Sequence, residues 1–510
     1  MNEIVKERLR SLRDALMAFS LVNLCFIRTR SGLFFDKDTG YYKQLPLSKH
    51  VLLALALNLI LFGLVGWRFA RWIRRTKSPL RYRVACVVVG GLLLIPIDFV
   101  RSSFGIVGDR MMTWVMNPLF IGSVLLVLVA VWRWPRFVLR IQAVALMILV
   151  PAVFLTFGRI GYCFLQVRPE ATPQYPALYS TPTPSMGPRV IWIIFDEMDQ
   201  RMAFSNRPKD CPLPEFDRLC AESLQATNAF PPSGSTIVSL PALITGRYLI
   251  KAVPASRSEL DITYANTSAP VEWSTQPTIF SRARSLGFNT ALVGWYHPYS
   301  RLLASSLNYC RWYPYGYYQR SRDVTLLRSM IAQIWSLVPQ LQLRWLHIDY
   351  YQRSTADASN LVKDDRYGLV LLHLPGAHAP GIYDPSKRTF TFTEFSRTRG
   401  YFDNLQLTDN TMGILRRDME QTGQWDRSWV IVSADHWWRE AWRYDGRMDH
   451  RVPFILKAPG KNQPVTYGST LNTVITHDLI LAILRKEVST IPEVVAWLDT
   501  HKPPPAPPID

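Results

Sequence analysis

Acidic residues and cysteines are scarce in this sequence, and each shortage excludes a class of function. The 510 residues include six cysteines, whose spacing matches no zinc-binding pattern. Only 39 Asp and Glu oppose 58 Lys and Arg, which gives a net charge of +19. Residues 1–170 alone hold 23 Lys and Arg against 8 Asp and Glu, a net of +15. Because this excess belongs to the part with long apolar runs, nucleic acid is not the expected partner.

The sequence also lacks an internal repeat and a cleavable signal pattern, since the basic start is followed directly by an apolar run. The cysteines divide between an apolar and a polar part of the chain. Cys211 and Cys220, in the polar part, are close enough for a short-loop disulfide if that part lies outside the cytoplasm. With Cys310 the number there is odd, so at least one thiol stays free or pairs elsewhere.

Apolar runs in the first 170 residues have the composition of membrane spans. There are five such runs, and the first is the shortest. They are Ala15–Ile27, 50–67, 84–104, 117–132 and 141–163.

The charges of the loops between these runs predict their orientation. The loop 68–83 holds seven basic residues and no acid, and Arg133, Arg136 and Arg140 follow the fourth run. Both loops are therefore expected in the cytoplasm. With five spans the N-terminus is also cytoplasmic and everything after Phe164 is outside. The alternative is four spans, in which the first run is interfacial or re-entrant and the N-terminus lies outside.

After six prolines in residues 168–188, the pattern changes to buried strands. Continuous apolar runs of strand length alternate with helical stretches such as Ile279–Leu286 and Phe402–Leu415. This alternation predicts an α/β domain with a mainly parallel central sheet and helices on both faces. We expect its chemistry at the carboxyl ends of the strands. The four runs are Val190–Phe195, Thr290–Val293, Leu369–Leu372 and Trp429–Val432.

Carboxylates and imidazoles follow several of these runs. Such groups together form an oxygen and nitrogen site for a divalent cation, Zn²⁺ or Mn²⁺. Each also has a structural interpretation, such as a helix cap for Asp196, and His373 is left out of the predicted ligands because it lies close to a strand. His297 at a strand end is a candidate substrate contact. The candidate ligands and contacts are Asp196, Glu197, His378, Asp435, His436 and His450.

The stretch 233–247 reads as a loop that breaks into a short helix, with three hydroxyls, Ser233, Ser235 and Thr236, at the break. A hydroxyl at a helix N-terminus is placed where the backbone favours negative charge, which suits a nucleophile that attacks an anionic ester. The alternative is that Ser235 or Thr236 only caps the helix.

Together these motifs resemble the sulfatase-like branch of the alkaline phosphatase superfamily over residues 189–495. The resemblance rests on Ile193-Ile-Phe-Asp196-Glu197, Thr236 with Thr245-Gly246-Arg247, His378-Ala-Pro, Ser433-Ala-Asp435-His436 and Arg451-Val-Pro-Phe. Sulfatases place a cysteine, later oxidised to formylglycine, ten residues before the glycine of Leu-Thr-Gly-Arg. Here that position is Thr236, and no Cys-x-Pro-Ser-Arg or Cys-x-Pro-Ala-Arg is present. Sulfate-ester hydrolysis by formylglycine is therefore not expected.

Threonine at this position is similar to the phosphotransferases of the branch, such as lipid A phosphoethanolamine transferases and lipoteichoic acid synthases. The resemblance implies that Thr236, Asp435, His436 and Asp196 and/or Glu197 hold the metal. It implies that His378 and His450 contact the substrate phosphate. Several of these transferases carry a single Glu where this chain has Asp-Glu, so which of the pair is the ligand is left open.

The expected activity is transfer of a phospholipid-derived phosphoethanolamine or phosphoglycerol group to a cell-envelope glycolipid or glycan, through a phosphothreonine at Thr236. The alternatives are a membrane-bound phosphodiesterase or sulfatase-like hydrolase, and an inactive envelope scaffold. The resemblance implies a bacterial inner membrane protein with a periplasmic catalytic domain. The predicted parts are a transmembrane domain, a Pro-rich linker, the catalytic domain and a Pro-rich tail, at 1–167, 168–188, 189–498 and 499–510.

Overall fold

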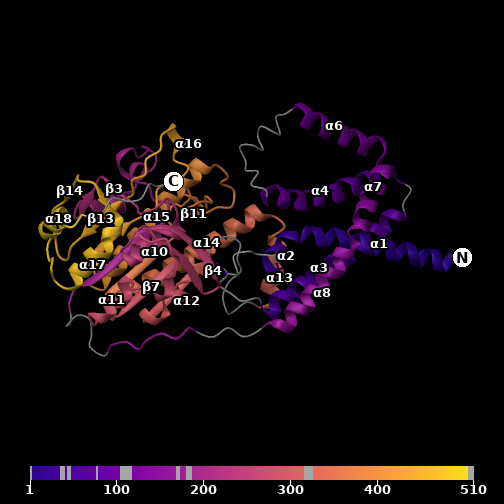
Figure 1. The fold of residues 1–510 in the computed structure, drawn as a ribbon. Helices are drawn as coiled ribbons and strands as arrows, with labels where there is room; N and C mark the ends of the chain where they lie inside the picture. Colours follow the sequence, from indigo (N-terminus) through magenta and orange to yellow (C-terminus); the bar gives the residue numbers. More distant parts are fainter. Residues whose placement is uncertain are drawn as a thin grey trace. The chain divides into compact units, whose positions relative to one another are not determined.

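The structure, a computed structural model, forms two compact units that are each discontinuous in sequence (Figure 1). A helical unit comprises Met1–Lys37, Leu45–Glu170 and Ser321–Gln342, and a sheet unit comprises Asp38–Gln44, Ala171–Arg320 and Leu343–Asp510. The two short exchanged segments were not predicted from the sequence. Most of the predicted Pro-rich linker and tail lies outside the described residues. The structure describes residues 3–34, 41–42, 48–75, 78–103, 118–167, 173–179, 187–314 and 325–502.

The helical unit contains three helices that are long and apolar enough to cross a membrane: α3, α4 and the continuous pair α7–α8. The run 15–27 lies in α1 and the start of α2, and α6 covers most of 117–132, but neither meets that length and composition. A membrane anchor is therefore indicated, and the five-span count stays a prediction. The helices are α1 (Glu3–Cys25), α2 (Ile27–Phe34), α3 (Lys49–Arg74), α4 (Pro79–Ser103), α6 (Pro118–Arg133), α7 (Pro135–Ile148), α8 (Val150–Gln166) and α13 (Leu326–Trp335).

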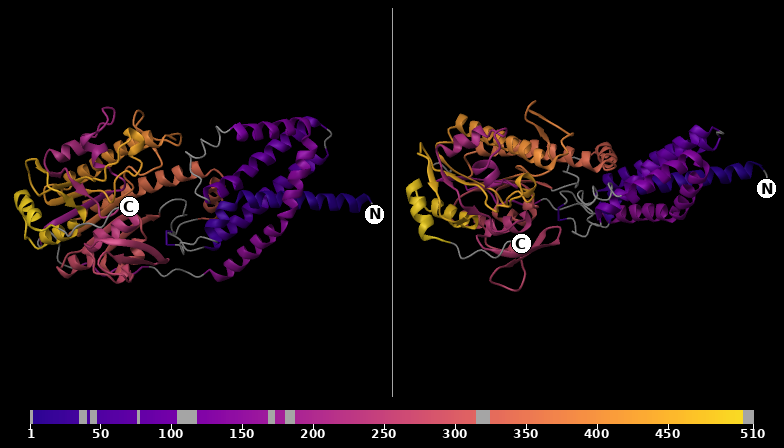
Figure 2. Two further views of the ribbon diagram at one scale, coloured as in Figure 1. Left: turned by 45° about the horizontal axis from the view of Figure 1, so that its top comes forward. Right: turned by 90° about the horizontal axis from the view of Figure 1, so that it is seen from above.

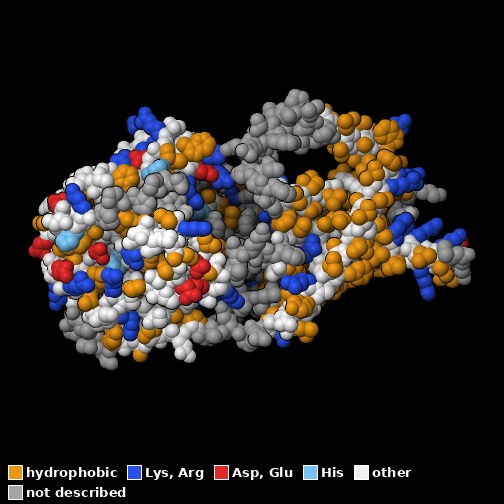
Figure 3. All heavy atoms as spheres, in the orientation of Figure 1, with side chains coloured by type: hydrophobic (Ala, Val, Ile, Leu, Met, Phe, Trp, Pro, Cys, Tyr) orange, Lys and Arg blue, Asp and Glu red, His pale blue; other side chains and the backbone are white. Residues whose placement is uncertain are grey.

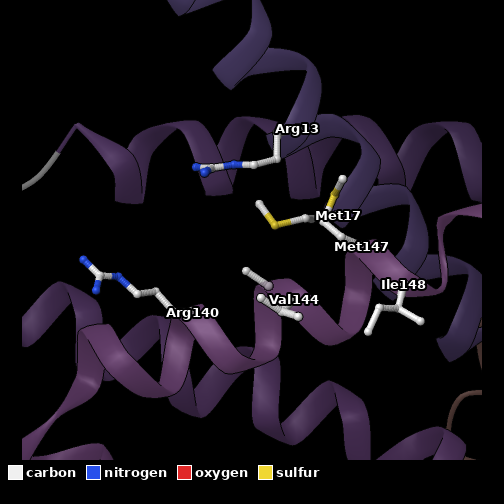
Figure 4. Close-up of a pocket in the computed structure, with 7 residues that line it drawn as sticks. Arg13, Met17, Arg140, Val144, Met147 and Ile148 are labelled. Atoms are coloured by element: carbon white, nitrogen blue, oxygen red, sulfur yellow. The ribbon is translucent and has the colours of Figure 1, made fainter.

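Apolar side chains cover the visible face of this unit, as the space-filling view shows (Figure 3). Leu126 of α6 and Leu155 of α8 are 71% and 73% exposed, respectively. An open cavity of about 520 Å³ lies between α1 and α7, lined by apolar side chains and the two guanidinium groups of Arg13 and Arg140 (Figure 4). Such exposed apolar surface is what a lipid-facing helix presents.

Polar side-chain contacts join several helices of this unit. Trp67 of α3 donates from Nε1 to the backbone oxygen of Ser11 at 3.2 Å, which places the basic start of α1 beside the basic end of α3. Helix α13, which lies in sequence between two strands of the sheet unit, packs on α3. There Asn58 donates to Gln333 Oε1 at 3.1 Å, and Gln333 donates to the backbone oxygen of Val51 at 2.9 Å.

The sheet unit is built on an eight-stranded sheet in the order β14-β2-β13-β12-β1-β9-β7-β8. Every neighbouring pair is parallel except the two made by β13. The strands are β1 (Arg189–Phe195), β2 (Leu224–Ala226), β7 (Thr290–Tyr296), β8 (Tyr309–Pro314), β9 (Leu369–Leu374), β12 (Ser428–Ser433), β13 (Phe454–Lys457) and β14 (Val465–Tyr467). The predicted mainly parallel sheet and all four predicted strands are confirmed.

Helices cover both faces of this sheet because its central strands are apolar on both sides. In β1, Trp192 packs into one core cluster, while its neighbours Ile191 and Ile193 pack into the other. Figure 2 shows the orange α14 and α15 on one side and the yellow α17 and α18 on the other. The α-helices of the sheet unit are α9 (Pro214–Cys220), α10 (Thr236–Thr245), α11 (Ile279–Ser285), α12 (Tyr299–Leu302), α14 (Pro339–Lys363, of which residues 339–342 belong to the helical unit), α15 (Arg397–Gln421), α16 (Trp442–Asp445), α17 (Thr476–Leu484) and α18 (Ile491–Thr500).

Smaller sheets complete the unit, and the cysteines do not crosslink it. All six cysteines lie in described ranges and are free thiols, so the possible disulfide between Cys211 and Cys220 is not formed. Cys211 is buried, and its thiol donates a hydrogen bond to the backbone oxygen of Phe402 at 3.7 Å. The small sheets are β4 (Leu249–Ser256) with β5 (Glu259–Tyr264) and β6 (Val271–Glu272), β10 (Tyr383–Asp384) with β11 (Thr389–Phe390), and β3 (Ala229–Phe230) with β15 (Leu471–Asn472).

Candidate active site

The carboxyl ends of four adjacent parallel strands, β12, β1, β9 and β7, bring polar residues to one edge of the sheet. Asp196 follows β1, and Asp435 and His436 follow β12. His373 lies in β9 opposite Ile194 of β1, one residue before the strand ends. The register of the strands therefore assembles groups that are far apart in sequence.

Helix α10 presents a hydroxyl to this edge. It begins at Thr236, whose Oγ1 lies 3.2 Å from His436 Nε2 and 3.4 Å from Asp196 Oδ2. The preceding Ser235 occupies the cap position, but its side chain makes no capping hydrogen bond. Gly246 ends the helix at φ 71°, a left-handed conformation that favours glycine. Of the three predicted hydroxyls, Thr236 is the one in contact with the acid and imidazole groups.

His436 faces the cluster with its Nε2. Its Nδ1 lies 2.9 Å from the backbone oxygen of Trp437, which can only accept, so Nδ1 carries a proton. Nε2 lies 3.5 Å from Asp196 Oδ1 and 3.6 Å from Asp435 Oδ2. A backbone partner on the far nitrogen is the usual arrangement of a histidine that binds metal.

Asp196, His373 and Asp435 form a group whose ligand atoms lie within 4.8 Å of one another, and all three are fully buried. Asp196 Oδ1, Asp435 Oδ2 and His373 Nε2 have no hydrogen-bond partner among the described residues. Buried polar atoms of this kind are costly unless a ligand satisfies them. Two carboxylates and imidazole nitrogens are donors that suit Zn²⁺ or Mn²⁺, so these residues fit a divalent cation.

The acids of the cluster influence each other's protonation. Burial, together with the neighbouring charges of Asp435 and Glu197, raises the pKa of Asp196 well above the usual value. Burial also favours the neutral form of Asp435, but the nearby imidazoles of His436 and His373 outweigh it and lower the pKa of Asp435. The edge thus carries closely spaced acids that a cation would stabilise in their ionised form.

Glu197 pairs with an arginine next to this group. Its φ of 57° is unusual for a residue with a side chain, and its carboxylate accepts a hydrogen bond from Arg439 Nε at 3.1 Å. Tyr401 donates to its backbone oxygen at 3.1 Å. Of the predicted Asp-Glu pair, Asp196 therefore presents its carboxylate to the cluster, and Glu197 forms an ion pair.

The other three predicted histidines have different surroundings. His297 is fully buried, and its Nε2 lies 3.3 Å from the backbone oxygen of Thr236. Burial lowers the pKa of His297 to about 3, so the ring is neutral. His378 is buried and packs edge-on against Trp295, with ring centroids 5.2 Å apart. His450 is half-buried and stacks on Trp437 at 4.1 Å.

Sequence analysis missed two residues that build the site. His373 was set aside because a histidine within a strand is usually structural, and only the register beside β1 shows where it lies. Gly376 has φ 54°, and a Cβ there would lie 2.6 Å from the backbone oxygen of Asp196. This glycine lets the loop after β9 pack directly on the backbone of Asp196.

The family comparison agrees with this architecture. A model of the sulfatase family matches residues 188–485, more than half of the chain. The chain belongs to the sulfatase family. No curated protein matches it in sequence.

Three solved structures match this chain at low sequence identity. A sulfatase from Pseudoalteromonas sp. is 14% identical, with 60% of this chain and 69% of that one covered and a TM-score of 0.41. A protein of the alkaline phosphatase superfamily from Vibrio parahaemolyticus is 16% identical, with 62% and 71% covered and a TM-score of 0.39. The lipoteichoic acid synthase LtaP from Listeria monocytogenes is 13% identical, with 60% and 75% covered and a TM-score of 0.39.

Proposed function

We propose that this sulfatase-family protein transfers a phospholipid-derived head group, phosphoethanolamine or phosphoglycerol, to a glycolipid or glycan of the cell envelope. The observation that carries the proposal is the contact of Thr236 Oγ1 with both His436 Nε2 and Asp196 Oδ2. A hydroxyl held against a base and a cation site has the setting of a nucleophile. Threonine, in place of the cysteine that sulfatases oxidise, favours a phosphate ester as substrate.

Asp196, Asp435, His436 and His373 would hold the cation, Zn²⁺ or Mn²⁺. When bound, such an ion lowers the pKa of a neighbouring hydroxyl and neutralises charge on phosphoryl oxygens. The N-terminus of α10, where Ser235 makes no side-chain capping bond, adds a favourable field for the anionic phosphate.

The reaction has two steps. Thr236 Oγ1 gives up its proton toward Asp196 Oδ2, which lies 3.4 Å away, and attacks phosphorus. The bond to the glycerol oxygen breaks, and diacylglycerol leaves as that oxygen is protonated. The resulting phosphothreonine then passes the head group to an acceptor hydroxyl or phosphate, which restores the threonine. His378 and His450 are the proposed contacts of the phosphate.

The membrane anchor supports a lipid donor, because it keeps the protein where phospholipid is concentrated. We propose the bacterial inner membrane, with the sheet unit on the periplasmic side. This orientation follows from the basic loops at 68–83 and after Ala130.

The test uses the full-length protein in vesicles of phosphatidylethanolamine and phosphatidylglycerol with Mn²⁺ or Zn²⁺. We expect Thr236→Ala to lower diacylglycerol release by on the order of 10³ or more, since it removes the nucleophile. Ser235→Ala is the matched control, because that hydroxyl is adjacent but makes no capping bond. Mass spectrometry should detect the head-group phosphate on the Thr236 peptide of the wild type.

Normal diacylglycerol release by the Thr236→Ala protein would overturn the proposal. Release of free head group that depends on Thr236, with no acceptor modified in envelope extracts, would instead identify a phosphodiesterase.

A further inference from the structure

One side chain of the sheet unit comes from the stretch between helices α2 and α3. Tyr41 belongs to the segment Asp38–Gln44, which groups with the sheet unit, and it is 0% exposed. It packs in the core cluster that also contains Leu240 and Leu243 of α10 and Trp273. A tyrosine buried this completely needs a partner for its hydroxyl.

That partner is His297. The Tyr41 hydroxyl lies 2.7 Å from His297 Nδ1, and His297 Nε2 lies 3.3 Å from the backbone oxygen of Thr236. A backbone oxygen only accepts, so Nε2 must carry the proton of the neutral ring. Nδ1 is then an acceptor, and the Tyr41 hydroxyl donates to it. The three residues form one directed chain of hydrogen bonds that ends at the main chain of the proposed nucleophile.

We propose that Tyr41 is a positioning residue for Thr236 and acts through His297. The inference rests on the proposed role of Thr236 as nucleophile. The rings of Trp273 and Tyr299 surround the imidazole, at centroid distances of 5.1 and 5.6 Å, and hold its plane. They do not determine which nitrogen carries the proton.

The Thr236 oxygen selects the tautomer with the proton on Nε2, and the Tyr41 hydroxyl supports that tautomer by donating to Nδ1. If Nδ1 carried the proton, Nε2 would turn a lone pair toward the oxygen of Thr236, and the two would repel. The hydrogen bond from Tyr41 stabilises the tautomer whose Nε2 donates to this oxygen. That second hydrogen bond fixes the first turn of α10. The position of the Thr236 side chain relative to Asp196 and His436 follows from that turn.

The experiment removes one oxygen atom and leaves the ring. Tyr41→Phe in the full-length protein should lower kcat for diacylglycerol release roughly tenfold, the effect of losing one hydrogen bond that orients a reacting group. KM for the lipid should stay within twofold, about the scatter of such values, because no substrate contact is removed. Tyr42→Phe is the matched control: it removes the neighbouring hydroxyl, which faces the Tyr296 hydroxyl at 3.3 Å.

A second background separates positioning from packing. In His297→Phe protein, whose ring keeps the core filled, Tyr41→Phe should have no further effect on kcat, since the chain is already broken. If the two substitutions instead multiply, Tyr41 acts independently of His297 and the proposal is overturned. The same holds if Tyr41→Phe and Tyr42→Phe lower kcat equally.

A readout that needs no activity distinguishes this proposal from the proposed function. The exchange rate of the His297 ring C2 proton with deuterium, measured by mass spectrometry, depends on the hydrogen bonds of that ring. It should rise in Tyr41→Phe and stay unchanged in Tyr42→Phe. A wild-type protein without Thr236-dependent release would overturn the proposed function, whereas an unchanged His297 exchange rate in Tyr41→Phe would overturn the bond from Tyr41.

Discussion

One buried carboxylate of the helical unit and two of the sheet unit have opposite surroundings. In the helical unit, the Asp14 side chain is 3% exposed and accepts from Arg74 Nε at 2.7 Å. Arg74 also pairs with Glu7 at 2.7 Å, so α1 and α3 are joined by a complete ion-pair network. In the sheet unit, Asp196 and Asp435 are fully buried, and no described Lys or Arg forms a salt bridge with either.

The difference indicates what each group is for. A buried acid with a guanidinium partner is satisfied by the fold itself and holds helices together. At the sheet edge, the raised pKa of Asp196 shows that its ionised form is unfavourable in the folded protein, and a divalent cation from outside would stabilise it. The comparison therefore separates a structural carboxylate from carboxylates kept for a ligand, and three substitutions test it.

The largest effect is expected for Asp435→Asn. The amide keeps the shape but loses the charge that a divalent cation requires, so bound metal per chain should fall and diacylglycerol release should drop by on the order of 10³. Because the pKa of Asp435 is lowered in the folded protein, its charge adds stability at neutral pH, so the metal-free variant should melt below the metal-free wild type. Metal analysis by mass spectrometry and thermal unfolding in detergent check both parts.

A variant that keeps its metal and activity would mean that Asp435 is structural, as Asp14 is. Ser433→Ala serves as the control, since that side chain is equally buried on the same strand and is not a predicted ligand.

The second-largest expected effect is a pH dependence of the melting temperature of the metal-free protein. The pKa of Asp196 is raised above the 3.8 of an exposed aspartate, mainly by burial. Such a group binds its proton more readily when folded, so the stability it adds is present below pH 3.8 and is lost as the pH rises through its folded value. The metal-free Asp196→Asn variant, which cannot ionise, should therefore melt several degrees above the wild type at pH 8.

The difference in melting temperature between Asp196→Asn and the wild type should narrow as the pH falls toward 4.5, because Asp196 in the wild type then also becomes neutral. Added Mn²⁺ or Zn²⁺ should reverse the order at pH 8 by stabilising the wild type alone. A gap that is constant with pH would show that ionisation of Asp196 does not determine the difference.

The sequence was sufficient for the parts of this site that depend on local patterns. Continuous apolar runs predicted the strands that end at Asp196 and before Asp435, and a hydroxyl before an apolar stretch predicted the start of α10 at Thr236. His373 depended on the register between β9 and β1, and Tyr41 on a chain path between two units. Neither leaves a local signal, because both are set by tertiary packing. The number of membrane spans stays a prediction, since two of the five runs form helices shorter or more polar than a span requires.

The smallest effect is expected for Asp14→Asn, which weakens the ion pair between Asp14 and Arg74 in the helical unit. Its oxygen can still accept from Arg74, and Arg74 keeps Glu7, so the helical unit should lose only about 1 kcal/mol of stability. Bound metal and diacylglycerol release should match the wild type, because Asp14 contributes no ligand to the sheet edge. Thermal unfolding and metal analysis are compared directly with those of Asp435→Asn. If Asp14→Asn lost metal to the same degree, the contrast between the two carboxylate groups would fail, since burial alone would then explain both.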